Sequence, residues 1–103
     1  MSIFDQMAIL VTDHAVYQYA LRFHAEAPTA AGELQRLRRT IEAEVREAFI
    51  ERRFSKSKPE GLHPPDDPLS LYAWNPGGYR VYAVRHDEHP PRFVVTTTMR
   101  PER

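Results

Sequence analysis

A long amphipathic run in the first half of the chain limits the folds open to a sequence of 103 residues. From about Thr29 or Ala30 to about Arg53, apolar residues recur every three or four positions, which is the spacing of one face of an α-helix. The stripe consists of Leu34, Leu37, Ile41, Val45, Ala48 and Phe49, with Arg52 at its end. A helix of this length must bury that stripe against other elements, and a chain of this size supplies one core. We therefore expect a single domain, residues 1–103, organised around this helix.

A shorter helix is predicted just upstream of it. Thr12 or Asp13 has an oxygen that can accept a hydrogen bond from a free backbone N–H, as a residue at a helix start does. The helix then runs through residues 14–24 and stops before Pro28, whose ring and missing N–H do not fit a helix interior. Its apolar stripe consists of Val16, Tyr19 or Ala20, and Phe23. Before the helix, the apolar residues 7–11 form a short buried strand or a hydrophobic lead-in.

The second half of the chain has the signals of an antiparallel sheet. After a long, proline-rich loop over Ser55–Pro68 come strand-like runs at Leu69–Trp74, Tyr79–His86 and Arg92–Met99. The first two runs flank the turn sequence Asn-Pro-Gly-Gly at 75–78, which makes them a hairpin, and a second turn follows at 87–91. The predicted fold is α+β, with two N-terminal helices packed on a three- to four-stranded antiparallel sheet.

The overall composition excludes several classes of protein. The 14 basic and 14 acidic side chains give a formal net charge of +0, so the chain lacks the basic excess of proteins that bind nucleic acid or anionic membranes indiscriminately. Without cysteine there is no disulfide framework and no thiolate zinc site. No apolar run reaches membrane-spanning length, and residues 1–11 lack a basic segment and a long signal core. We therefore expect a cytoplasmic protein without a membrane partner.

Strict alternation along the last two strands predicts a sheet face rich in cations and hydroxyls. On the last strand one face would hold Phe93, Val95 and Thr97, and the other Arg92, Val94, Thr96, Thr98 and Arg100. With the middle strand, the second face is expected to present Arg80, Tyr82, Thr96, Thr98 and Arg100 together. Such groups suit phosphate binding and the stabilisation of a charged transition state without a metal. Because threonine and tyrosine are ordinary strand residues, a purely structural role is the alternative.

The start of the first helix carries a candidate catalytic group. His14 can transfer protons near neutral pH, and the helix N-terminus disfavours its cationic form, which makes it a better base than acid. Arg22 follows about two turns later on nearly the same face, so that both side chains could contact one anion. The alternative is a histidine that bonds only a neighbour or water, with Tyr17, Tyr19 and Phe23 in the core.

The end of the long helix offers a second set of cations. Arg52, Arg53, Lys56 and Lys58 close the helix and enter the loop, where they could hold a phosphate backbone. The helix also carries many glutamates and cations suit a helix C-terminus, so the alternative is a solvated face.

Histidine and carboxylate residues in the two loops are potential metal ligands. His86-Asp87-Glu88-His89 could combine with His63, Asp66 and Asp67 to bind zinc or manganese. No third ligand stands at a diagnostic spacing, and polar residues are expected in turns. We therefore expect no metal and no other cofactor.

The order of these features resembles a known superfamily. A Thr-Asp-His-Ala helix start at 12–15, a second amphipathic helix and a meander that closes on residues 93–98 are similar to small bacterial and phage ribonuclease toxins of the RelE-like and barnase-like type. The segment His14–Tyr19, which reads His-Ala-Val-Tyr-Gln-Tyr, and the Val-Val-Thr strand at 94–96 resemble one branch of that superfamily. The resemblance covers residues 9–99.

This resemblance implies metal-independent cleavage of RNA through attack of a ribose 2′-hydroxyl. His14 would act as the acid or base, and Arg22 and Arg80 would stabilise the anionic transition state. Tyr79 or Thr98 would position the substrate. The expected substrate-binding residues are Arg52, Arg53, Lys56 and Arg100. RNA would be the substrate, and a cognate antitoxin or a host protein the partner.

A different class of function fits the same sequence. A non-catalytic phage or bacterial interaction module would bind and modulate a host protein through the hairpin or the long helix. Such a module needs an exposed apolar patch, for which Leu62, Tyr72 and Trp74 are the candidates. An enzyme instead needs His14, Arg22 and the sheet residues to converge within hydrogen-bond reach.

Overall fold

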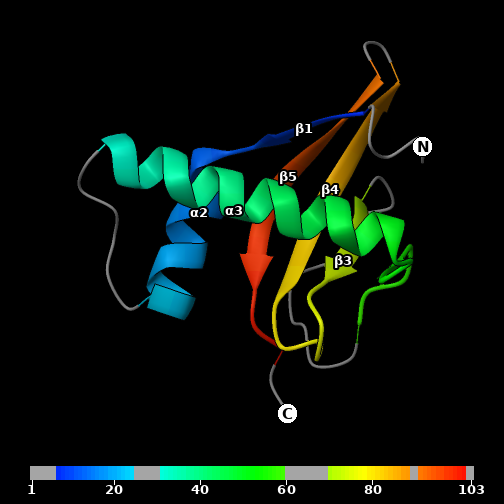
Figure 1. Ribbon diagram of the computed structural model, residues 1–103. Coiled ribbons are helices and arrows are strands. Elements are labelled where there is room, and N and C mark those ends of the chain that lie inside the picture. The colour runs from blue at the N-terminus through cyan, green and yellow to red at the C-terminus, as the bar shows by residue number, and fades with distance from the viewer. Residues whose placement is uncertain (1–6, 25–30, 60–69, 89–90, 102–103) are drawn as a thin grey trace.

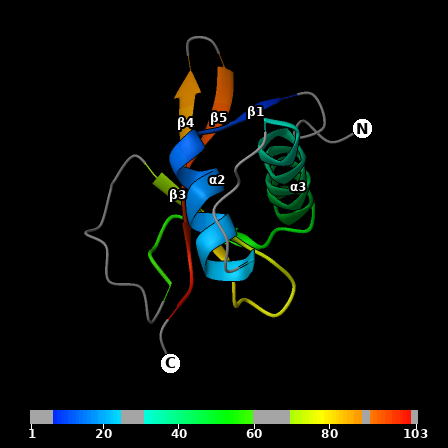
Figure 2. The same ribbon diagram turned by 90° about the vertical axis from the view of Figure 1, so that its left-hand side faces the viewer.

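Helices and strands combine in this chain as an α+β fold, with both helices on one side of a sheet (Figure 1). The computed structural model describes residues 7–24, 31–59, 70–88 and 91–101. The elements are β1 (Ala8–Val11), α2 (Asp13–Tyr19), η1 (Ala20–His24), α3 (Ala31–Ile50), β2 (Phe54–Ser55), β3 (Ser70–Trp74), β4 (Val81–Glu88) and β5 (Pro91–Met99). η1 is a short π-helix that continues α2. Figure 2, which is turned by 90°, shows that α2 and α3 cross at a steep angle.

The sheet is mixed, whereas the sequence predicts an antiparallel one. Among the described residues five strands pair in the order β1-β5-β4-β3-β2. β3, β4 and β5 pair antiparallel in sequence order, as expected, and the unexpected strand β2 pairs antiparallel with β3. β1, in contrast, lies parallel to β5. The prediction of three or four antiparallel strands is wrong for this edge because turn signals report only local hairpins. A parallel pair needs a long connection, and here all the other elements of the chain, from α2 to β4, lie between β1 and β5.

The helix start at Thr12 is confirmed and is joined directly to the sheet. Thr12 Oγ1 accepts a hydrogen bond from the Ala15 N–H at 3.2 Å, as an N-cap residue does. Its backbone N–H donates to the Val95 carbonyl at 3.0 Å, and its hydroxyl lies 3.3 Å from the Thr96 carbonyl, to which it donates. The first turn of α2 is therefore fixed to β5.

The long helix is confirmed, but it ends at Ile50 and not near Arg53. Arg52 has a φ of 60°, the left-handed conformation that commonly terminates helices. The Arg53 N–H then bonds back to the Ala48 carbonyl at 2.7 Å, so a carbonyl at the helix end is satisfied. This helix end could not be predicted from the sequence, because the residue with a left-handed backbone after a helix is usually glycine, and an arginine there does not indicate a helix end. The next residues pair with β3 as the short strand β2, which was expected to be helix end and loop.

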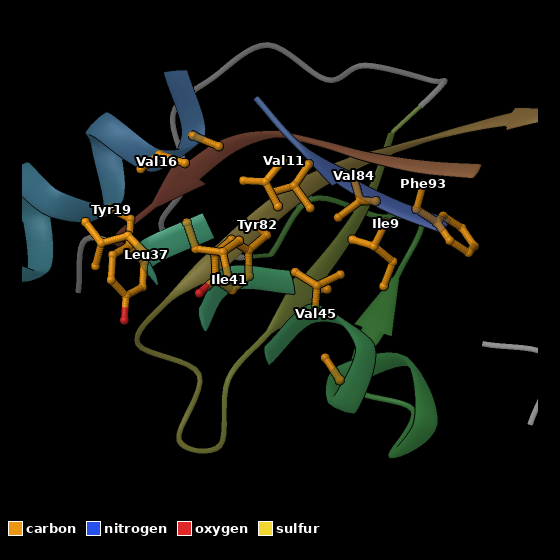
Figure 3. Packing of buried hydrophobic residues seen from close by; sticks show 14 of the residues in the cluster. Ile9, Val11, Val16, Tyr19, Leu37, Ile41, Val45, Tyr82, Val84 and Phe93 are labelled. Atoms are coloured by element: carbon orange, nitrogen blue, oxygen red, sulfur yellow. The ribbon is translucent and has the colours of Figure 1, made fainter. Parts of the chain in front are cut away.

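The core lies between the helices and one face of the sheet (Figure 3). α3 contributes Leu37, Ile41, Val45, Ala48 and Phe49, and α2 contributes Ala15, Val16 and Tyr19; the sheet contributes Ile9, Val11, Ala73, Tyr82, Val84, Phe93 and Val95. Every member of the α3 stripe from Leu37 to Phe49 is buried, as its spacing predicts, and Leu34 is half-buried. Because burial of apolar surface is the main favourable contribution to folding, this stripe determines where α3 lies.

A β-bulge on β5 changes which residues face the helices. Val84 pairs with Val95 and Ala83 with Thr97, so Thr96 is an extra residue between them. Beyond it the alternation is shifted by one position. Thr98 therefore lies on the helix face with Val95, while Met99 joins a second buried cluster on the opposite face, with Tyr72, Val81 and Ala83. Strict alternation was wrong in placing Thr98 opposite Val95.

The α3 stripe gives a first test of this packing. Ile41 is fully buried, so Ile41→Ala should lower the free energy of unfolding by about 2–5 kcal/mol through lost contacts and a residual cavity. Leu21, which is 59% exposed, is the control, because Leu21→Ala should change that free energy by no more than about 0.5 kcal/mol. Urea unfolding followed by circular dichroism measures both. Equal losses would contradict the assignment of the core.

Candidate functional site: an arginine and aromatic cluster

The turn between β3 and β4 places Arg80 at one end of the sheet. Asn75 is buried, and its side-chain oxygen accepts a hydrogen bond from the Arg80 N–H at 2.9 Å. The Asn75 N–H donates to the Arg80 carbonyl at 3.1 Å. Gly77 and Gly78 have φ values of 95° and 72°, which glycine adopts without strain, so the Asn-Pro-Gly-Gly turn is confirmed. Since Val81 pairs with Met99, the last residue of β5, the next residue along the chain, Arg100, lies at the same end of the sheet as Arg80.

A carboxylate on α3 binds the Arg80 guanidinium. Arg80 Nε and Nη2 donate to the two oxygens of Glu44 at 2.7 and 3.1 Å, a bidentate pair. The Tyr82 hydroxyl donates to the same carboxylate at 2.8 Å. The side chains of Arg80 and Glu44 are only 12% and 18% exposed, so this pair is largely shielded from water. The three groups join α3 to β4 through charge-assisted hydrogen bonds.

Burial and this pair shift the protonation equilibria around Arg80. Burial lowers the pKa of Arg80, but its hydrogen bond to Glu44 and the surrounding charges outweigh that effect, so the pKa rises above its ordinary value. Burial raises the pKa of Tyr82, and the Glu44 carboxylate raises it further. Burial also raises the pKa of Tyr19. Arg80 therefore remains a cation, and both phenols remain neutral, at physiological pH.

Three aromatic rings surround the Arg80 guanidinium. Its central carbon lies 5.0 Å from the ring centre of Tyr19, 4.8 Å from that of Phe23 and 5.3 Å from that of Tyr79. The guanidinium of Arg100 lies 4.8 Å from the ring centre of Phe23 and donates to the Arg22 carbonyl at 2.5 Å. We call Tyr19, Phe23, Tyr79, Arg80 and Arg100 the arginine–aromatic cluster. These distances are those of cation–π contacts.

The outer part of the cluster is open to solvent. Tyr79 is 54% exposed and Arg100 is exposed, whereas Phe23 is half-buried and Tyr19 is buried. The charge of Arg80 is compensated by its ion pair with Glu44, whereas in the described part of the chain Arg100 has no carboxylate partner. The surface thus offers a cation and an aromatic face side by side.

The predicted catalytic residues do not all meet here. Tyr79 and Arg80 belong to the cluster. Arg22 touches it only through its backbone carbonyl, which accepts the hydrogen bond from Arg100, and Arg22 itself is exposed. His14 is exposed in the first turn of α2 and lies outside the cluster. Nine residues separate it from Phe23, which corresponds to about 13 Å along a helix.

Thr98 lies inside the molecule. It is fully buried, and its hydroxyl donates to the Ala15 carbonyl at 2.8 Å. Its backbone N–H donates to the Gln18 side-chain oxygen at 2.9 Å. Of the five residues expected to share one sheet face, Arg80, Tyr82, Thr98 and Arg100 lie toward the helices, whereas Thr96 is the extra residue of the bulge. Tyr82 and Thr98 are fully buried and so are not presented to a ligand. The position of Thr98 is that of a residue that fastens α2 to β5.

The four predicted substrate-binding residues separate into two places. Arg100 is in the cluster, while Arg52, Arg53 and Lys56 follow the end of α3. Arg52 and Lys56 are exposed. Arg53 Nε donates to the Trp74 carbonyl at 3.1 Å, its Nη1 pairs with Glu51, and its Nη2 is a buried atom without a hydrogen-bond partner among the described residues.

The remaining expectations concern an apolar patch, the candidate metal ligands and the membrane. Tyr72 is buried and Trp74 is half-buried, so neither heads an exposed apolar patch, while Leu62 lies outside the described residues. The described residues hold no group of three or more side chains that could bind a metal ion. The candidate ligands His63, Asp66, Asp67 and His89 lie outside them. In the described residues no helix is long and apolar enough to span a membrane.

Sequence reasoning missed Glu44 and placed Tyr19 and Phe23 only in the core. The signal for Glu44 was its position in the apolar stripe, three residues after Ile41 and four before Ala48. A carboxylate at such a position needs a buried partner, and Arg80 provides it.

Comparison with known proteins finds no family model, no curated protein and no solved structure that matches this chain.

The raised pKa of Tyr82 makes stability fall at alkaline pH. As the pH rises above about 10, the phenol of the unfolded chain loses its proton while that of the folded chain keeps it, so the free energy of unfolding decreases. Tyr82→Phe should cost about 1 kcal/mol near neutral pH through the lost hydrogen bond, and it should lose less stability than the wild type above about pH 10. Urea unfolding at several pH values measures this. If the free energy of unfolding of the wild type and of Tyr82→Phe fell equally above about pH 10, the prediction would be contradicted.

Proposed function

We propose that this protein binds single-stranded RNA along the outer face of α2 and η1 and cleaves it as a toxin-type, metal-independent endoribonuclease. The observation that carries the proposal is the exposed Arg100 guanidinium over the ring of Phe23, whose own neighbour is the exposed ring of Tyr79, with ring centres 6.4 Å apart. Unpaired bases stack on aromatic rings, and guanidinium groups bind phosphate. Double-stranded nucleic acid hides its base faces, so this surface suits a single strand.

The outer face of the first helix extends this surface. His14, Tyr17, Leu21 and Arg22 are exposed on α2 and η1, from the first helical turn to the cluster. Tyr17 is 40% exposed and offers a further ring between His14 and the cluster. A strand bound to the cluster could follow this face for about two nucleotides, which would bring a phosphate near His14.

Cleavage in this proposal takes place at the His14 end. His14 takes the proton of a ribose 2′-hydroxyl, whose oxygen attacks the adjacent phosphorus; the bond from phosphorus to the 5′-oxygen breaks, and that oxygen takes a proton from water. Arg22, eight residues and therefore about 12 Å further along the helix, binds the phosphate of a neighbouring nucleotide. The products are a 2′,3′-cyclic phosphate and a 5′-hydroxyl end.

A second candidate function is supported by the apolar residues of the same face. Leu21 is 59% exposed and lies one turn from Tyr17, so the two form a small apolar surface that a protein partner could bury. This favours the interaction-module alternative, with an antitoxin or a host protein as the partner. RNA binding distinguishes the two functions.

Binding is tested with a labelled single-stranded RNA by fluorescence anisotropy. Tyr79→Ala should weaken binding about tenfold or more, since a base–aromatic stack contributes about 1–3 kcal/mol. Arg100→Ala should also weaken it and flatten the salt dependence, because a strand held by one to three cations gives a logarithmic slope of only about −1 to −2. Arg39→Ala, an exposed arginine on α3, is the control and should bind as the wild type does. Equal affinity of all four proteins would refute RNA binding at the cluster.

Cleavage is tested separately, with labelled total RNA in EDTA. The wild type should cleave, His14→Ala should not, and His14→Ala should still bind the RNA. Product ends carrying cyclic phosphate would identify attack by the 2′-hydroxyl. Binding without cleavage by the wild type would leave an RNA-binding protein and exclude the nuclease. If the wild type neither binds nor cleaves RNA, the interaction module is favoured. That function is then tested by searching for a protein partner that binds the wild type and does not bind the Leu21→Glu variant.

A further inference from the structure

The outward edge of β1 has backbone groups that the sheet does not use. β1 is an edge strand, and its only neighbour among the described strands is β5. The Thr12 N–H donates to Val95 of β5. Because successive residues of a strand direct their N–H and C=O groups to opposite sides, Ile9 and Val11 direct theirs away from β5. The carbonyl of Met7, the residue before β1, is turned to the same side, where Arg46 binds it. Such an edge is a template for pairing with another strand.

Two arginines of α3 occupy this edge. Arg46 Nη1 donates to the Met7 carbonyl at 3.1 Å, and Arg38 Nε donates to the Val11 carbonyl at 3.0 Å. The spacings match, because eight residues of helix and four residues of strand both span about 12–13 Å. Arg38 is also paired with Asp13, and Arg46 with Glu42 at 3.2 Å. Both guanidinium groups are thus held in place by carboxylates. Figure 1 shows β1 and α3 side by side.

The outward residues Met7 and Val11 lie two positions on either side of Ile9, so residues 7–11 present a symmetric edge when the extended backbone of β1 is continued to Met7. If a second copy paired with β1 in antiparallel orientation, Ile9 would face Ile9 of that copy and Met7 would face Val11 of that copy. All the outward groups of both strands would then be used, so the edge is complementary to itself, as a two-fold interface requires. Leu10, which is 46% exposed, would be covered by such pairing.

We infer that the β1 edge is a self-pairing surface that Arg38 and Arg46 keep closed. The partner is a second copy of this chain, joined β1 to β1 into one continuous sheet. The two arginines compete with it because they already hold the Met7 and Val11 carbonyls. This inference does not depend on RNA binding.

Removal of both arginines tests the inference by sedimentation velocity on the full chain. The wild type should be a monomer, and Arg38→Ala/Arg46→Ala should shift to dimer with an unchanged far-ultraviolet spectrum. Arg36→Ala/Arg39→Ala is the matched control, because it removes the same charge from exposed positions of α3 and should stay monomeric. If the double variant does not fold, the single variants decide the result. A folded variant that stays monomeric, or a control that dimerises equally, would overturn the proposal.

Introduced cysteines test the register, since the chain contains none. In the proposed dimer Ala8 of one copy faces Leu10 of the other, with Cα atoms about 4.5 Å apart, within the reach of a disulfide. In the Arg38→Ala/Arg46→Ala background, an oxidised mixture of Ala8→Cys and Leu10→Cys chains should therefore crosslink. Each chain alone should not, because like positions lie on a diagonal about 7–8 Å apart. Equal crosslinking of the single chains would overturn pairing about Ile9.

Discussion

The Glu44 carboxylate is the group on which the arrangement at this end of the molecule depends. It accepts hydrogen bonds from Arg80 and from Tyr82, so one side chain of α3 fixes two residues of β4 and its preceding turn. Removing one partner of a shielded pair is costly, because the other charge stays behind without compensation. The pair also sets the plane of the Arg80 guanidinium. Phe23 of η1 packs on that guanidinium, so the position of η1 follows from Glu44 as well.

The bulge on β5 and the cap at Thr12 hold α2, the helix that η1 continues, against the sheet. The extra residue at Thr96 turns Thr98 toward α2, where its hydroxyl meets the Ala15 carbonyl. Thr12 holds the first turn to β5, and Gln18 accepts a bond from the Thr98 backbone. The inner face of α2 is bonded to β5, and the outer face of α2 and η1, from His14 to Arg22, carries exposed residues. A site built on a fastened helix keeps its geometry better than one on a loop.

The elements that could be predicted from the sequence are those whose signals lie within a few neighbouring residues. The α3 stripe, the Thr12 cap and the turn at 75–78 are each encoded within a few residues, and all are found in the structure. The parallel β1–β5 pair depends on contacts more than eighty residues apart in sequence, and the bulge depends on how β4 and β5 fit together. Neither leaves a local pattern.

The candidate site was predictable only in part, for the same reason. Tyr79, Arg80 and Arg100 stand out as chemically able residues on predicted strands, and the structure brings them together. The contacts of Arg80 with Glu44 and Phe23 could not be predicted, because they form only when α3 and η1 pack on the sheet. The net charge of +0 does not argue against a local anion site, because the charges are unevenly distributed in the structure. In the part of the chain that the structure describes, carboxylates pair with Arg38, Arg46, Arg53, Arg80 and Arg92. The carboxylates thus neutralise arginines that hold elements of the fold together, whereas Arg100 keeps its positive charge at the surface, over the half-buried ring of Phe23, which is the arrangement that the proposed binding of a phosphate and a base requires.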